Sequence, residues 1–87
     1  MAIKRILLVD DSPALLTEIR NAIESVDAHF FTASSGSETV EKAKAEMPDI
    51  IFMDIVMDNL DGYCACREIR KDAQTRDIPV IFVSTKH

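Results

Sequence analysis

Residues 49–54 read DIIFMD, four consecutive apolar residues between two aspartates. An apolar run of this length, without polar alternation, is typical of a strand that is buried on both faces. Two further runs share the pattern, ILLV at residues 6–9 and VIFV at residues 80–83. Because strands buried on both faces belong to parallel sheets covered by helices, the three runs predict an α/β protein.

The segments between these runs carry helix signals. Ser12 and Pro13 form a helix start, with serine as the N-cap and proline at the first helical position. SGSE at residues 35–38 is a capping-box pattern that opens a second helix, and Pro48 ends it. GYCACREIRK at residues 62–71 is predicted to form a third, short helix.

HFFTA at residues 29–33 completes the pattern as a further strand, so the predicted element order is βαβαβαβ. We expect one domain spanning residues 1–87, because no linker, repeat or low-complexity segment interrupts the alternation. The last strand, in IPVIFVSTKH at residues 78–87, is apolar enough to need neighbours on both sides. The domain is therefore expected to be incomplete after this strand.

Composition and charge narrow the function classes. The chain has 87 residues, 47% of them hydrophobic, which suffices for one small core. A net charge of -5, with basic residues scattered among acids, argues against nucleic-acid binding by this segment. The apolar run at residues 6–9 is far too short for a signal peptide or a membrane span, so we predict a cytoplasmic chain without membrane contact.

The cysteines and histidines do not suggest a metal centre. Cys64 and Cys66 are two residues apart on a predicted helix, where their side chains cannot converge on one metal ion. We interpret them as reduced packing residues. His29 is expected at the edge of the sheet opposite the acidic residues, and both it and His87 are expected to be solvated.

Polar residues collect where the predicted strands end. Asp10 and Asp11 follow the first strand, Asp54 ends the third, and Ser84 follows the fourth. In open parallel sheets the working site lies beyond the carboxyl ends of the strands. Aspartates also follow strands as ordinary turn residues, but three coinciding strand ends favour a site. Neighbouring carboxylates repel one another, so a hard dication, Mg²⁺ or Mn²⁺, is the expected cofactor.

Three stretches together resemble the receiver domain of two-component response regulators, and the resemblance covers all 87 residues in order. They are ILLVDDSP at residues 6–13, DIIFMDIVMDNLDG at residues 49–62 and IPVIFVSTK at residues 78–86. The resemblance implies a CheY-like, flavodoxin-like doubly wound parallel sheet. It also supplies the strand order 2-1-3-4, with the family's fifth strand and last two helices missing.

The family's functional residues carry over to matching positions. The resemblance implies that Asp54 is the phosphoacceptor and that Ser84 is the switch hydroxyl that hydrogen-bonds the phosphoryl group. It further implies that Mg²⁺ is held by Asp10, Asp11, Asp54 and the backbone carbonyl of Val56. The implied partner is a histidine kinase or a histidine phosphotransfer protein. The domain would then be a signalling module and not a conventional enzyme, with self-catalysed phosphotransfer and dephosphorylation.

The sequence departs from the family pattern at three points. Asp58 stands where the family usually has proline, and Thr85 stands where a smaller alanine is common. The family's phosphoryl-contacting lysine ends the fifth strand, which is absent. Lys86 follows the fourth strand directly and is no substitute. We therefore expect slower phosphorylation than in a complete receiver.

Three other interpretations fit parts of the sequence. Met57–Glu68 matches several positions of a calcium loop, but the first position is methionine and an apolar strand precedes it. A magnesium phosphohydrolase with an aspartyl nucleophile would need a further acid and a capping region. A non-signalling interaction or assembly module with an impaired acidic site remains the main alternative.

An unpaired fourth strand would have its own consequence. If the chain ends at His87, the backbone groups along one edge of that strand are exposed. We then expect a homodimer, or a domain-swapped assembly, through this edge. Pairing of the strand with its own copy about a two-fold axis would be antiparallel.

Overall fold

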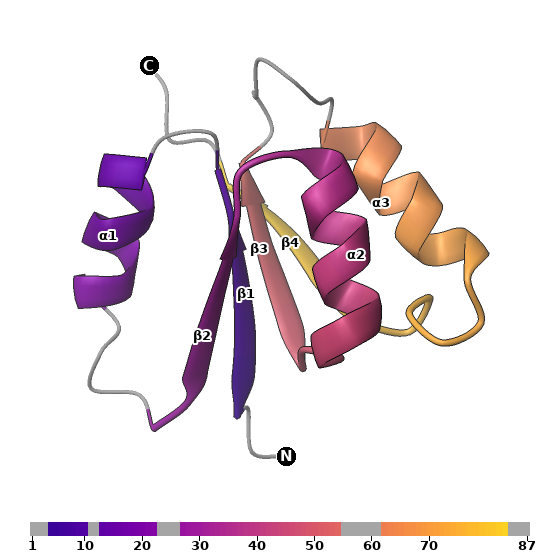
Figure 1. Cartoon of the computed structure of the whole chain (residues 1–87), viewed down its shortest axis with the longest axis horizontal. Coiled ribbons are helices and arrows are strands. Elements are labelled where there is room, and N and C mark those ends of the chain that lie inside the picture. The colour runs from indigo at the N-terminus through magenta and orange to yellow at the C-terminus, as the bar shows by residue number, and fades with distance from the viewer. Residues whose placement is uncertain (1–3, 11–12, 23–26, 55–61, 84–87) are drawn as a thin grey trace.

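The structure is a computed structural model that describes residues 4–10, 13–22, 27–54 and 62–83. It contains four strands and three helices in alternation (Figure 1). Their bounds are β1 Arg5–Val9, α1 Pro13–Ala22, β2 His29–Ala33, α2 Gly36–Glu46, β3 Ile50–Asp54, α3 Gly62–Lys71 and β4 Val80–Val83. The predicted order βαβαβαβ is confirmed, although the N-cap predicted at Ser12 lies outside the described residues.

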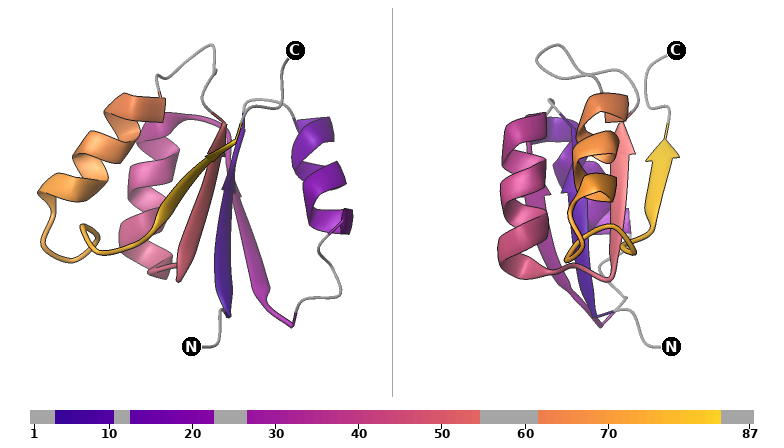
Figure 2. Two further views of the ribbon diagram at one scale, coloured as in Figure 1. Left: turned by 180° about the vertical axis from the view of Figure 1, so that it is seen from behind. Right: turned by 90° about the vertical axis from the view of Figure 1, so that its right-hand side faces the viewer.

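The strands form one parallel sheet in the order β2-β1-β3-β4. Helix α1 covers one face, and α2 and α3 lie together on the other face (Figures 1 and 2). The parallel sheet with helices on both faces confirms the prediction from the strand pattern, and the strand order 2-1-3-4 confirms the flavodoxin-like, doubly wound arrangement that the family resemblance implied. In such a sheet all carboxyl ends of the strands point to the same edge.

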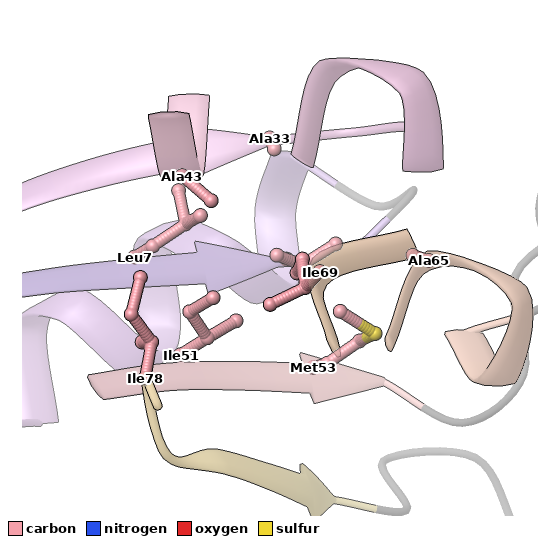
Figure 3. Packing of buried hydrophobic residues seen from close by; sticks show 9 residues of the cluster. Leu7, Ala33, Ala43, Ile51, Met53, Ala65, Ile69 and Ile78 are labelled. Atoms are coloured by element: carbon pink, nitrogen blue, oxygen red, sulfur yellow. The ribbon is translucent and has the colours of Figure 1, made fainter. Parts of the chain in front are cut away.

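The larger hydrophobic cluster lies between the sheet and helices α2 and α3. Alternate residues of β1 and β3 supply its sheet side, because successive side chains of a strand point to opposite faces. Figure 3 shows these side chains meeting Ala43 of α2 and Ile69 of α3. The buried members are Leu7, Val9, Ala33, Ala43, Ile51, Met53, Ala65, Ile69 and Ile78.

The α1 face is covered less completely. Ile6, Leu8 and Leu16 are buried there, while Phe52 of β3 is only partly buried. Ile81, which pairs with Phe52 in the β3–β4 register, is 44% exposed. The prediction that the fourth strand is buried on both faces is therefore wrong for the described residues. The physical reason is that α1 is the only helix on this face in the described part of the chain.

Helix α2 begins with a variant of the predicted capping box. The Ser35 hydroxyl accepts a hydrogen bond from the backbone N–H of Glu38 at 3.2 Å, as expected for an N-cap. The Glu38 carboxylate accepts from the N–H of Ser34 at 2.7 Å, one residue before the position that a standard box uses. This backbone hydrogen bond is the main reason why the pKa of Glu38 is lowered.

Helix α2 ends at a left-handed C-cap. The C-cap residue is Met47, with φ 48°. Its backbone N–H donates to the Ala43 carbonyl at 3.1 Å, and its side chain is 45% exposed. Pro48 follows, and since proline cannot continue a helix, the predicted stop is confirmed.

The connection from α3 to β4 is held by side chains of α3 and of the connection itself. Arg70 Nη1 donates to the carbonyl oxygens of Arg76 and Ile78, both at 2.8 Å. The buried hydroxyl of Thr75 donates to the Ile69 carbonyl at 2.7 Å. The Ile69 carbonyl belongs to the last turn of α3, and the other two carbonyls follow the helix, so these bonds tie the connection to α3 ahead of β4.

A cluster of polar contacts joins the N-terminal ends of β1 and β3. The Asp49 carboxylate accepts from the backbone N–H groups of Lys4 at 2.8 Å and Arg5 at 3.0 Å. The Arg5 guanidinium donates to the Glu46 carbonyl at 2.7 Å and lies 4.9 Å from the centre of the Phe31 ring. Hydrogen bonds from Lys4 and then from Arg5 lower the pKa of Asp49.

Substituting Asp49 with asparagine is expected to reduce the acid sensitivity of the fold. The pKa of Asp49 is lower in the folded chain, so the unfolded chain binds more protons in acid. The stabilisation from Asp49 is therefore complete above the ordinary aspartate pKa of about 4 and is lost as the pH falls through the folded value. Urea unfolding at pH 7 and pH 3 should show a smaller difference for the variant. An unchanged difference would show that this carboxylate does not contribute.

Candidate functional site

Two of the predicted site residues lie side by side at the carboxyl edge of the sheet. Asp10 directly follows β1, and its backbone N–H donates to the Ala33 carbonyl of β2 at 3.1 Å. Asp54 is the last residue of β3 and pairs with Val83 of β4. Because Val9 pairs with Met53, the next residue of each strand brings Asp10 beside Asp54.

The remaining predicted site residues are Asp11, Val56 and Ser84, which lie outside the described residues. The side chain of Asp54 is likewise not described. Ser84 follows Val83 directly in sequence, and Val83 is in register with Asp54. The ends of β1, β3 and β4 therefore meet at one edge, while the roles of the residues there remain predictions.

The burial of Asp10 is the strongest physical feature of this edge. The residue is only 1% exposed, among the least accessible polar residues of the described chain. A carboxylate removed from water is costly unless hydrogen bonds or a cation compensate its charge. Carboxylate oxygens at such an edge fit a hard dication such as Mg²⁺ or Mn²⁺.

Among the side chains that the structure describes, no group of three histidine, cysteine, aspartate or glutamate residues could hold a metal ion. Of the three predicted carboxylate ligands, only Asp10 has a described side chain. The side chains of Asp11 and Asp54 are not described. This result therefore does not test the predicted magnesium site.

Three other residues stand out in the sequence, His29, Cys64 and Cys66, which are not among the predicted site residues. His29 begins β2 at the opposite edge, is exposed, and donates its backbone N–H to the Lys4 carbonyl at 2.7 Å. Both cysteines are free thiols; Cys66 is partly buried, but Cys64 is exposed, contrary to a simple packing role.

A shallow pocket between α2 and α3 was not predicted. It measures about 220 Å³ and is lined by Gly36, Ser37, Val40, Cys64, Ala65 and Glu68. Its lining comes from the first two turns of the two helices, and such a contact between helices carries no sequence motif. Separately, none of the described helices is long and apolar enough to cross a membrane.

Comparisons with known proteins agree with this architecture. Residues 6–87 match the model of the response regulator receiver domain. The chain is 44% identical over 82 residues to protein PilH of Pseudomonas aeruginosa, covering 94% of this chain and 68% of PilH. The N-terminal domain of a response regulator receiver protein from Methanoculleus marisnigri superimposes with a TM-score of 0.87 at 38% identity, covering 94% of this chain and 67% of that one.

A second solved structure is informative about the site. The receiver domain of the sensor histidine kinase PA1611 from Pseudomonas aeruginosa matches with a TM-score of 0.87 at 34% identity, covering 98% of this chain and 70% of that one. That structure is described with a magnesium ion coordinated in its active-site cleft. The family match over residues 6–87, the parallel sheet and the shared carboxyl edge lead to one conclusion: the chain belongs to the receiver domains of response regulators.

Proposed function

We propose that this chain is a phosphoacceptor module of a two-component phosphorelay, with Asp54 as the residue that receives the phosphoryl group. The observation that carries the proposal is the buried Asp10, which the strand register brings beside Asp54 at the carboxyl edge. Asp10, Asp11, Asp54 and the Val56 carbonyl would hold Mg²⁺ or Mn²⁺. The receiver domain of PA1611, at 34% identity and described with magnesium in its active-site cleft, supports magnesium as the cation.

In the proposed reaction an oxygen of the Asp54 carboxylate attacks the phosphorus of a phosphohistidine donor. A P–O bond forms, the P–N bond breaks, and its electron pair returns to the imidazole of the donor. The bound metal would neutralise charge on the transferring oxygens, which is the main requirement of phosphoryl transfer. Asp10 would help to hold the cation near the Asp54 carboxylate, and the Ser84 hydroxyl would donate to a phosphoryl oxygen once the acyl phosphate has formed.

The proposed reaction also implies a phosphoryl donor and a cellular compartment. A receiver domain needs a donor, so we propose a histidine kinase or a histidine phosphotransfer protein as the partner, in the cytoplasm. We further propose that residues 1–87 belong to one domain, since all four described strands share one sheet. Water attack on the acyl phosphate would return Asp54 to its free state, giving self-catalysed dephosphorylation without a conventional substrate.

Incubation with acetyl phosphate and Mg²⁺, followed by intact-mass measurement, tests the proposal against its alternatives. A single labile phosphoryl adduct supports the phosphoacceptor function. Turnover of acetyl phosphate without an adduct would indicate a phosphohydrolase. Neither adduct nor turnover would indicate the alternative of a non-signalling interaction or assembly module with an impaired acidic site.

Extending the chain with the fifth strand and last two helices of a complete receiver domain is expected to raise the phosphorylation rate. The resemblance assigns that part of a receiver a lysine that contacts the phosphoryl group, and a second cation there stabilises the charge that develops during transfer. Stopped-flow or timed intact-mass measurements with acetyl phosphate would compare the two proteins. Equal rates would show that the metal and Ser84 suffice.

A second proposal concerns the edge strand β4. In the described part of the chain β4 pairs only with β3, and its Ile81 is 44% exposed on the incompletely covered α1 face. An exposed apolar edge strand is a template for pairing with another chain. We propose that the polypeptide of residues 1–87 forms a dimer in which two β4 strands pair antiparallel about a two-fold axis, or exchange elements.

Dilution of the 87-residue polypeptide is expected to shift it from dimer to monomer. Burial of the β4 edge and of Ile81 provides the driving force, since both are accessible in the single chain. Multi-angle light scattering over a concentration series measures the mass directly. A monomeric mass at every concentration would refute pairing through β4.

A further inference from the structure

The two edge strands of the described sheet, β2 and β4, differ in the side chains that lie along their outer edges. In the described chain β2 forms the edge opposite β4 and pairs only with β1. The His29 N–H donates to the Lys4 carbonyl, and the Ala33 carbonyl accepts from the Asp10 N–H. Because alternate residues of an edge strand face its single neighbour, the backbone groups of Phe30 and Thr32 point outward.

One of these outward groups is already occupied. Lys42 of α2 is half-buried, and its ammonium group donates a hydrogen bond to the Thr32 carbonyl. The same ammonium lies 3.7 Å from the Glu38 carboxylate, one helical turn earlier. Lys42 therefore spans from α2 to the outer edge of β2 and is held there by an ion pair.

We infer that Lys42 closes the β2 edge to strand addition, so that of the two edges of the described sheet only the β4 edge is open to a second copy of the 87-residue polypeptide. An arriving strand would need the Thr32 carbonyl as an acceptor, and it would have to displace or bury a charged ammonium group. Both steps are unfavourable, and charged side chains at edges discourage pairing for this reason. At the β4 edge the chain presents the apolar Ile81 instead.

The number of chains in the assembly depends on which edge strands can accept a further strand. Two sheets that meet at their β4 edges form a closed pair, because the outer edges of the joined sheet are then the two β2 strands. If β2 also accepted a strand, pairing would continue at both ends and give open-ended chains. The limit to a dimer rests on the proposed pairing through β4, whereas the closure of β2 by Lys42 stands without it.

Lys42→Met removes the ammonium group and keeps an unbranched side chain. Lys71→Met is the matched control, because Lys71 also pairs with a helical glutamate, Glu68 at 3.7 Å, but on α3. Sedimentation velocity at equal protein and salt concentration should show a weight-average mass at least about twice the wild-type value for Lys42→Met, since the variant has two open edges where the wild type has one. The control should retain the wild-type mass.

A double variant separates edge pairing from simple misfolding. Thr32→Pro removes an outward-facing backbone N–H from β2, a position where an edge strand tolerates proline. The variant Lys42→Met/Thr32→Pro is therefore expected to return to the wild-type mass. Persistent large species in the double variant would overturn the inference.

The remaining outcomes are also decisive. An unchanged mass for Lys42→Met would refute the role of Lys42, even if the wild type is a dimer. A monomeric wild type would refute the proposed pairing through β4 but not the closure of β2 by Lys42. In that case Lys42→Met should still associate, through its β2 edge. Growth of Lys71→Met to the same extent would show that lost charge, and not the open edge, drives association.

Discussion

Asp54→Asn is expected to show no phosphoryl adduct after incubation with acetyl phosphate and Mg²⁺, where the wild-type chain shows one. An amide oxygen is not an effective nucleophile toward phosphorus, so the substitution removes the acceptor itself. It also removes one anionic ligand from the proposed metal site, which should weaken Mg²⁺ binding. Intact-mass measurement reports the adduct, and the metal-induced rise in melting temperature reports the binding.

Asp49→Asn supplies the control within the same strand segment. Asp49 precedes β3 and Asp54 ends it, so the same substitution is made at opposite ends of one strand. The Asp49 carboxylate accepts hydrogen bonds from the backbone of Lys4 and Arg5, and its loss should change stability without removing the adduct. Metal-induced stabilisation that survives unchanged in Asp54→Asn would contradict the proposed metal site.

Ile51→Ala is expected to destabilise the domain by about 3 kcal/mol, within the range of 2–5 kcal/mol found for such core truncations. Ile51 lies at the centre of the cluster between the sheet and helices α2 and α3, with 0% exposure. A small domain has a total stability of only about 5 kcal/mol at the low end, so most of it would be lost. Thermal unfolding followed by circular dichroism should show a fall in melting temperature of about 12–24 °C.

Met47→Ala is the control for this core substitution. Met47 is also a large apolar residue, but it is 45% exposed at the end of α2. Its truncation leaves no buried cavity, so we expect a change within about 0.5 kcal/mol. If both variants lost similar stability, the cluster around Ile51 would not be the main core of the domain.

The fold was predictable because its strongest signals are local in sequence. The runs at residues 6–9 and 50–53 mark central strands, and both supply buried residues to the core. Ser35 and Pro48 mark the limits of α2 through capping and through the missing N–H of proline. The strand order itself came from the family resemblance, because periodicity does not determine which strands are neighbours.

Features that depend on contacts between distant elements could not be predicted. The exposure of Ile81 follows from what covers the sheet, and an apolar run reads the same at an edge as at the centre. The bond from Lys42 to the Thr32 carbonyl joins a helix to a strand, and a lysine on a helix surface gives no sign of such a partner. The hydrogen bonds of Asp49 to Lys4 and Arg5 likewise join residues more than 40 positions apart.

For the candidate site, the sequence predicted the edge but not its complete geometry. The register that brings Asp10 beside Asp54 is as expected from two aspartates that end neighbouring strands. The near-complete burial of Asp10 was not expected, since residues after strands are usually solvated. Asp11, Val56 and Ser84 keep the roles that the family resemblance gives them as proposals.

The most direct test of the account is to locate the phosphoryl group by tandem mass spectrometry. Trypsin cleaves after Lys44 and Arg67, so residues 45–67 form one peptide, which contains Asp49, Asp54, Asp58 and Asp61. After incubation with acetyl phosphate and Mg²⁺, borohydride reduction converts an aspartyl phosphate into a stable homoserine. The account predicts homoserine at position 54 and nowhere else, and only when the divalent cation is present. Homoserine at another aspartate, or an unmodified peptide from a chain whose Mg²⁺ binding has been demonstrated, would contradict it.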